Sequence, residues 1–140
     1  MKQFVFIACF LSLALVVQAQ QEVINLPAPK KTGGKPLMEV LNARKSTRAY
    51  TGESISYQTL SNLLWAAFGY NRPGMRTAPS AMNRQEIDIY VLFKTGIYLY
   101  DAQNNKLTLH VKGNFVKSLG GQDFVKDAAV NLIYVANTDK

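Results

Sequence analysis

The sequence predicts an α+β fold in which an antiparallel central sheet is flanked by helices. Before residue 70, apolar residues recur twice at helical spacing. After residue 86, they alternate with polar residues in three runs separated by short turns, which is typical of an antiparallel meander. The 140 residues include one cysteine, Cys9, and one histidine, His110. These exclude a disulfide framework, a cysteine-ligated zinc site and a histidine cluster, so we expect no bound metal.

The N-terminus has the features of a secretory signal peptide over residues 1–19. Lys2 supplies the positive charge that precedes the apolar run from Phe4 to Val17. That run is shorter than the roughly 20 residues that a membrane span needs. Small residues on either side of Gln18 suit cleavage before Gln20. We therefore expect an exported protein, either periplasmic or secreted.

Residues 20–35 are predicted to form an extended leader or linker. They contain Pro27, Pro29 and the adjacent Gly33 and Gly34, all of which disfavour regular structure. Residues 36–140 are then expected to form one domain.

Two amphipathic helices are predicted ahead of the sheet. The first begins near Pro36, which suits the first turn of a helix, and ends near residues 44–46. The second follows Ser56 as its N-cap and ends at Gly69. In both helices the apolar face is expected to be buried: Leu37, Val40 and Leu41 in the first, and Leu60, Leu63, Leu64, Ala67 and Phe68 in the second.

The remaining elements alternate between loops and strands. Residues 69–79 are expected to form a loop, and a short helical turn follows around residues 80–83. The strands of the meander are predicted at 87–91, 97–101 and 107–111. After a short helical stretch within 113–127, the nearly continuous apolar run 128–136 predicts a strand covered on both faces.

Two polar clusters are the candidates for chemistry. In the first, Arg44, Lys45, Ser46 and Arg48 crowd the end of the first helix. Guanidinium groups match phosphate oxygens, although cations at a helix C-terminus also complement the helix dipole. The second cluster runs from Pro79 to Gln85, and its amide side chains suit the edge of a heterocycle or simply a capped turn. Basic residues are otherwise scattered, so we expect no nucleic-acid partner.

The two clusters together resemble motifs of the nitroreductase family of FMN-dependent flavoenzymes. The first motif stands here as Arg44-Lys45-Ser46-Thr47-Arg48-Ala49-Tyr50, and the second as Pro79-Ser80-Ala81-Met82-Asn83-Arg84-Gln85. Their order and the amphipathic helix between them match the family as well. The resemblance covers residues 36–140, which are identified as the N-terminal portion of a nitroreductase-like domain.

The resemblance implies FMN as the cofactor and assigns residues to it. Arg44, Lys45, Ser46 and Arg48 match positions that hold the FMN phosphate and ribityl chain. Pro79, Ser80 and Ala81 match the segment against the flavin ring, Asn83 a ring or ribityl hydrogen-bonding position, and Gln85 a position nearby. The resemblance further implies hydride transfer from NAD(P)H, or electrons from another donor, to a nitroaromatic, quinone or similar acceptor. It also implies a homodimer with FMN between the subunits.

Family members continue beyond the strand predicted at 128–136, so we expect the C-terminal part of the domain to be missing. This leaves two alternatives open. The chain is either an active enzyme or a catalytically inactive, truncated flavin-binding or structural remnant. A third possibility is an interaction module whose apolar last strand pairs with another chain. We also expect a truncated chain to leave the second helix and the last strand uncovered.

Overall fold

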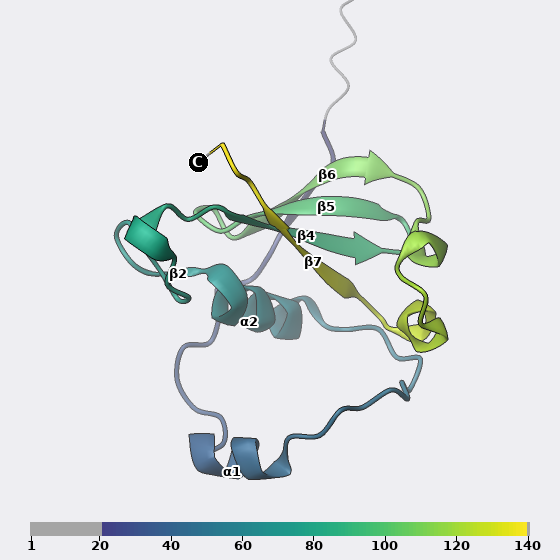
Figure 1. The fold of residues 1–140 in the computed structure, drawn as a ribbon, viewed down its shortest axis with the longest axis horizontal. Helices are drawn as coiled ribbons and strands as arrows, with labels where there is room; N and C mark the ends of the chain where they lie inside the picture. Colours follow the sequence, from purple (N-terminus) through teal and green to yellow (C-terminus); the bar gives the residue numbers. More distant parts are fainter. Residues whose placement is uncertain (1–20, 140) are drawn as a thin grey trace, which may run out of the picture.

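The computed structural model describes residues 21–139 and is drawn in Figure 1. The predicted signal peptide, residues 1–19, lies outside these described residues and stays a prediction. No helix within them is long and apolar enough to cross a membrane.

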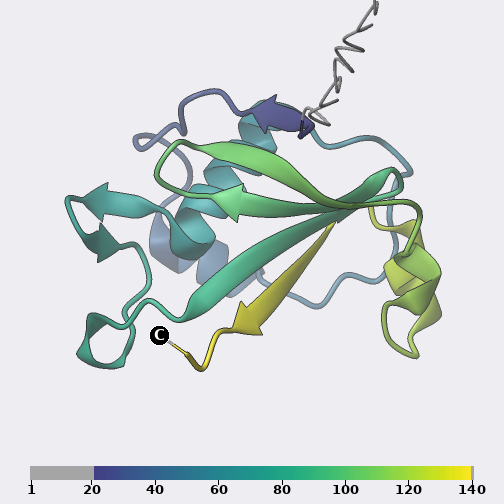
Figure 2. The same ribbon diagram turned by 90° about the horizontal axis from the view of Figure 1, so that it is seen from above.

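A five-stranded antiparallel sheet forms the centre of the fold (Figures 1 and 2). Its strand order is β1-β6-β5-β4-β7. The strands are β1 (Val23–Asn25), β4 (Ile87–Phe93), β5 (Gly96–Asp101), β6 (Lys106–Lys112) and β7 (Asn131–Ala136). The predicted meander is confirmed as β4-β5-β6, in which Leu99 lies opposite both Tyr90 and Thr108. The predicted α+β class is therefore confirmed.

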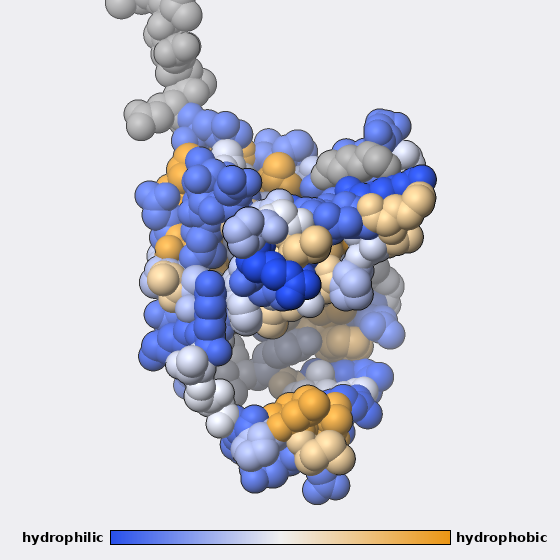
Figure 3. Space-filling view, turned by 90° about the vertical axis from the view of Figure 1, so that its left-hand side faces the viewer, coloured by the Kyte–Doolittle hydropathy of each residue, from blue (hydrophilic) through white to orange (hydrophobic). Residues whose placement is uncertain are grey.

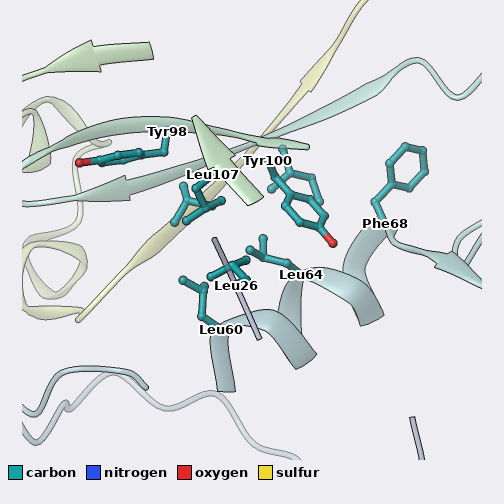
Figure 4. Packing of buried hydrophobic residues seen from close by; sticks show 9 residues of the cluster. Leu26, Leu60, Leu64, Phe68, Tyr98, Tyr100 and Leu107 are labelled. Atoms are coloured by element: carbon teal, nitrogen blue, oxygen red, sulfur yellow. The ribbon is translucent and has the colours of Figure 1, made fainter. Parts of the chain in front are cut away.

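Helix α2 (Tyr57–Phe68) covers one face of the sheet and supplies most of the helical part of the core. Ser56 caps the helix as predicted, because its Oγ accepts a hydrogen bond from the Thr59 N–H at 3.1 Å. The predicted stripe is confirmed as buried at three positions and exposed at Leu63. Figure 4 shows the buried positions against the sheet: Leu60, Leu64 and Phe68, packed with Leu26, Ile89, Val91, Tyr98, Tyr100 and Leu107. The expectation that α2 would be left uncovered is wrong for Leu60, Leu64 and Phe68 and right for Leu63.

Helix α1 (Leu37–Ala43) behaves differently. It contributes no buried residue, and its side chains Leu37, Val40 and Leu41 are 69%, 47% and 55% exposed. Figure 1 shows the helix beyond α2, away from the sheet. The predicted buried stripe is therefore wrong here, because α1 lies outside the layer in which the core forms.

The leader, residues 20–35, is not an extended linker throughout. Val23–Asn25 forms β1 and pairs with β6 at one edge of the sheet, and Leu26 enters the core. The Ser61 Oγ donates a hydrogen bond to the Pro27 carbonyl at 2.6 Å. The correction has a physical reason: β6 has unpaired backbone groups at its edge, and β1 satisfies them.

Two further segments correct the prediction. The expected loop 69–79 contains a small hairpin of β2 (Tyr70–Arg72) and β3 (Met75–Arg76). Strand β7 is not covered on both faces, because its last three residues are exposed although successive residues point to opposite faces. The expectation that the last strand would be left uncovered is confirmed for this part of β7. Short 3-10 turns complete the fold: η1 (Ala81–Asn83), η2 (Val116–Ser118) and η3 (Asp123–Asp127).

Candidate functional site

The first predicted cluster is an exposed segment that follows α1. The helix ends at Ala43, and Arg44 adopts an extended backbone conformation, so the last helical turn contains no basic residue. Arg44 is the C-cap residue and the other cations follow it, so the cluster lies at and beyond the end of the helix and not within its last turn. All residues from Arg44 to Tyr50 are exposed, and none forms an ion pair with a carboxylate of residues 21–139.

An open cavity of about 470 Å³ lies beside this segment. The Arg48 guanidinium, at its wall, also lies 5.7 Å from the centre of the Phe124 ring. Lys94 comes from the turn between β4 and β5, and Lys126 comes from η3, where it pairs with Asp123 at 2.6 Å. The full lining is Arg48, Ala49, Tyr50, Thr51, Gly52, Lys94, Lys126 and Asp127. Because Lys126 is paired with Asp123, two cations, Arg48 and Lys94, stand against the Asp127 carboxylate, and this excess of positive charge favours an anionic ligand such as a phosphate.

The second predicted cluster forms a tight loop between β3 and β4. The backbone of Met82, Asn83 and Gln85 is left-handed, with φ of 51°, 54° and 53°. Residues other than glycine rarely adopt this backbone conformation unless the surrounding structure stabilises it. The Ser80 Oγ supplies part of that support by accepting a hydrogen bond from the Gln85 N–H at 2.8 Å. Pro79 and Ala81 are exposed on the loop.

Both the oxygen and the nitrogen of the Gln85 amide form hydrogen bonds that hold this loop against the β2–β3 hairpin. Its Oε1 accepts from the Tyr70 hydroxyl at 3.2 Å and from Arg76 Nε at 2.9 Å. Its Nε2 donates to the Gly74 carbonyl at 2.8 Å and to Asn83 Oδ1 at 3.1 Å. Asn83 in turn donates from Nδ2 to the same Gly74 carbonyl at 3.2 Å. Gln85 thus has no hydrogen-bonding capacity left for a ligand in this conformation.

The sequence did not identify Arg76 as a candidate site residue. Its guanidinium is nevertheless held by two hydrogen bonds and two aromatic rings beside the second cluster. Its guanidinium carbon lies 3.9 Å from the centre of the Tyr70 ring and 4.7 Å from that of Phe68. Its NH1 group donates to the Phe68 carbonyl at the end of α2 at 3.1 Å. The only signal available in the sequence was its position three residues before Pro79.

The two clusters lie at opposite ends of β4. Gln85 precedes the first residue of the strand, whereas Lys94, beside the first cluster, follows its last residue. Seven strand residues span about 23 Å. The cavities that the two clusters line share no residue. A single chain therefore does not bring the two clusters together.

The fold and these clusters define an α+β protein with an exposed cationic segment and a separate Pro-Ser loop. Residues 41–140 match the model of the nitroreductase family, and the chain belongs to that family. This confirms the resemblance on which the motifs were assigned.

Two relatives illustrate the match. A protein of Ralstonia eutropha JMP134, described as a putative nitroreductase, has a crystal structure that matches with 44% sequence identity and a TM-score of 0.78. The match covers 84% of this chain and 57% of that one. A putative nitroreductase of Methanocaldococcus jannaschii is 28% identical over an aligned length of 115, and the match covers 74% of this chain and 58% of that protein. The chain thus spans less than three fifths of the length of either relative.

Proposed function

We propose that this chain acts as an FMN-dependent oxidoreductase of the nitroreductase type. In this proposal, hydride passes from NAD(P)H through the flavin to a nitroaromatic, quinone or similar acceptor. The observation that carries the proposal is the exposed Arg44–Tyr50 segment, whose cations have no carboxylate partner among residues 21–139. This segment resembles the family's first motif and lies within the residues that match the family model.

The residues of the first cluster are assigned to the charged end of the cofactor. The guanidinium groups of Arg44 and Arg48 and the ammonium of Lys45 would neutralise the FMN phosphate, and the Ser46 hydroxyl would add a neutral hydrogen bond. The extended backbone after Ala43 keeps all four side chains exposed for this contact. When bound, the flavin supplies the redox chemistry, so no protein side chain needs to act as an acid or base.

The residues of the second cluster divide into two groups. Pro79, Ser80 and Ala81 are proposed to lie against the flat flavin ring, because Pro79 and Ala81 are exposed and the Ser80 hydroxyl donates to no acceptor within residues 21–139. Asn83 and Gln85, predicted as direct contacts, are proposed to hold the loop in position instead, because their amides bond to the hairpin.

We also propose a homodimer, with the first cluster of one copy facing the second cluster of its partner. Two observations support it. The clusters lie at opposite ends of β4 within one chain, and the apolar side of α1 is exposed. A Leu41→Asp substitution is expected to shift the protein towards the monomer in light scattering, since it places a charge on that apolar side. An unchanged dimer would exclude α1 from the interface.

A second candidate function is a flavin-binding or structural remnant without turnover. In this alternative the chain oxidises neither NADH nor NADPH. Export is proposed in both cases from residues 1–19, and mass spectrometry of the exported protein is expected to show a chain beginning at Gln20.

The decisive experiment is titration of the full chain with FMN, followed by flavin fluorescence. The double substitution Arg44→Gln and Arg48→Gln is expected to weaken FMN binding about a hundredfold, since each charge-assisted contact contributes about tenfold. Lys30→Gln, an exposed cation of the leader, serves as the control and is expected to leave binding unchanged. A protein that never retains FMN contradicts the proposal. Bound FMN without NADH or NADPH oxidation supports the remnant instead.

A further inference from the structure

The β2–β3 hairpin separates two open cavities of about 380 Å³ each, at the end of the molecule that faces the viewer in Figure 3. Both are lined by Asn71 and Arg72. The first also includes Lys31 of the leader and Gln103 of the β5–β6 turn. The second also includes Arg76 and the loop residues Pro79, Ser80 and Asn83. We call these two cavities together the hairpin surface.

The hairpin surface carries three cations and no acidic lining residue. Lys31, Arg72 and Arg76 line it, and neither cavity includes an aspartate or glutamate. None of the three pairs with a carboxylate of residues 21–139. A concave surface with charges of one sign concentrates ligands of the opposite sign, so this end of the molecule attracts anions.

Arg76 shows that part of this charge is held in place. It is partly buried between two aromatic rings, and two of its five N–H groups bond to the Phe68 carbonyl and the Gln85 amide. The other three have no partner among residues 21–139. Arg76 lines the second cavity, so these remaining N–H groups can exchange water for the oxygen atoms of an incoming anion. Such a fixed fork suits a planar carboxylate or a phosphate.

We propose that the hairpin surface binds the anionic group, carboxylate or phosphate, of the small molecule that exchanges electrons at the proposed flavin site. The identity of that molecule as a substrate rests on the proposed function; the anion site itself does not. Pro79 and Ser80, assigned above to the flavin ring, line the same cavity as Arg72 and Arg76. A ligand anchored by these two arginines therefore lies against the segment that faces the ring.

The test uses the full chain and its single tryptophan, Trp65, as the reporter. Trp65 lies beside the first cavity, because its Nε1 donates to the Tyr70 carbonyl at 3.0 Å and Lys31 Nζ lies 5.5 Å from its ring. Benzoate, the uncharged benzamide and inorganic phosphate are titrated without FMN, and calorimetry provides an independent dissociation constant. Benzoate or phosphate is expected to bind at least about tenfold more tightly than benzamide.

Two arginines provide a matched pair of variants. Arg72→Gln is expected to weaken anion binding about fivefold, whereas Arg84→Gln, an equally exposed arginine that lines neither cavity, is expected to leave it unchanged. Arg76→Gln tests the partly buried Arg76 guanidinium. If that variant does not fold, Arg72→Gln is the deciding measurement. Tighter binding of phosphate than benzoate identifies a phosphate-bearing ligand, and the reverse order identifies a carboxylate; both support the proposal.

The proposal is overturned if benzoate and phosphate bind no better than benzamide, or if Arg72→Gln and Arg84→Gln have the same effect. Its failure is distinguishable from a failure of the proposed function. Anion binding in a chain that never retains FMN supports the hairpin site and contradicts the flavin assignment. FMN retention without anion selectivity supports the flavin assignment and contradicts the hairpin site.

Discussion

Helices α1 and α2 have similar amphipathic sequences and different environments. In α2, Leu60 and Leu64 are fully buried beneath the sheet, whereas in α1 Leu37 and Leu41 are more than half exposed. Figure 3 shows the apolar side chains of α1 as a separate orange group, with a hollow between them and the rest of the molecule. Apolar spacing thus predicts that a helix forms and which side is apolar, but not what that side packs against.

The two proposed sites divide in a similar way. The first cluster follows the exposed helix and is itself exposed along its whole length. The second cluster follows the buried helix and is held by hydrogen bonds through Ser80, Asn83 and Gln85. Only the second is organised within one chain. We therefore expect changes near α2 to affect stability, and changes near α1 to affect association and binding.

The largest expected effect comes from truncating the core side of α2. Leu64→Ala is expected to lower the free energy of unfolding by about 2–5 kcal/mol, because it removes a fully buried side chain and leaves a cavity. Leu41→Ala in α1 is the matched control, and its expected loss in the monomer is below about 0.5 kcal/mol. Urea unfolding of both variants, at a protein concentration low enough to dissociate the proposed homodimer, checks the difference. A comparable loss in the two monomeric variants would show that α1 packs on the core as α2 does, and the contrast between the two helices would be wrong.

A second prediction concerns Tyr100, which lies between the sheet and α2 (Figure 4). Burial raises the pKa of Tyr100 to about 12, although the nearby Arg76 charge opposes the increase and Asp101 adds to it. Because the unfolded phenol titrates near 10.0, this contribution to stability is present below pH 10 and is lost as the pH rises to about 12.

Tyr100→Phe is expected to remove this part of the alkaline loss, about 1–2 kcal/mol when solvent screening is included. Unfolding free energies from about pH 8 to about pH 12 measure it. Some slope will remain, because burial and a hydrogen bond to Glu22 also raise the pKa of Tyr98. An unchanged pH profile would mean that α2 does not keep Tyr100 out of water.

Much of the fold could be predicted from the sequence, because its determinants are local. The alternation in β4, β5 and β6, the Ser56 cap and the Gly69 end of α2 all depend on neighbouring residues. At Gly69, an added Cβ would lie 2.8 Å from the Trp65 Cα, so a side chain is excluded there. The missed features depend on residues far apart in the chain. Strand β1, for example, pairs with β6 more than 80 residues later.

The candidate site shows the same limit. The motifs identified the cationic segment and the Pro-Ser loop, because residue types and spacing are visible in a sequence. The use of the Gln85 amide was not predictable, because it depends on where the β2–β3 hairpin places Tyr70 and Arg76. The hairpin surface was missed for the same reason, since Lys31 and Arg72 are brought together only by the fold.

The smallest expected effects come from the helix caps. Ser56→Ala removes the hydrogen bond from the Thr59 N–H and is expected to lower the free energy of unfolding by about 1 kcal/mol.

Helix α1 has no side-chain cap at Pro36, so Pro36→Ser would introduce a capping side chain there. That change is expected to leave the free energy of unfolding within about 0.3 kcal/mol of the original, because α1 contributes no buried residue through which a firmer helix could stabilise the core. Urea unfolding measures both values. A gain from Pro36→Ser as large as the loss from Ser56→Ala would show that the two helices are coupled to the core to the same extent, and the contrast between them would then be wrong.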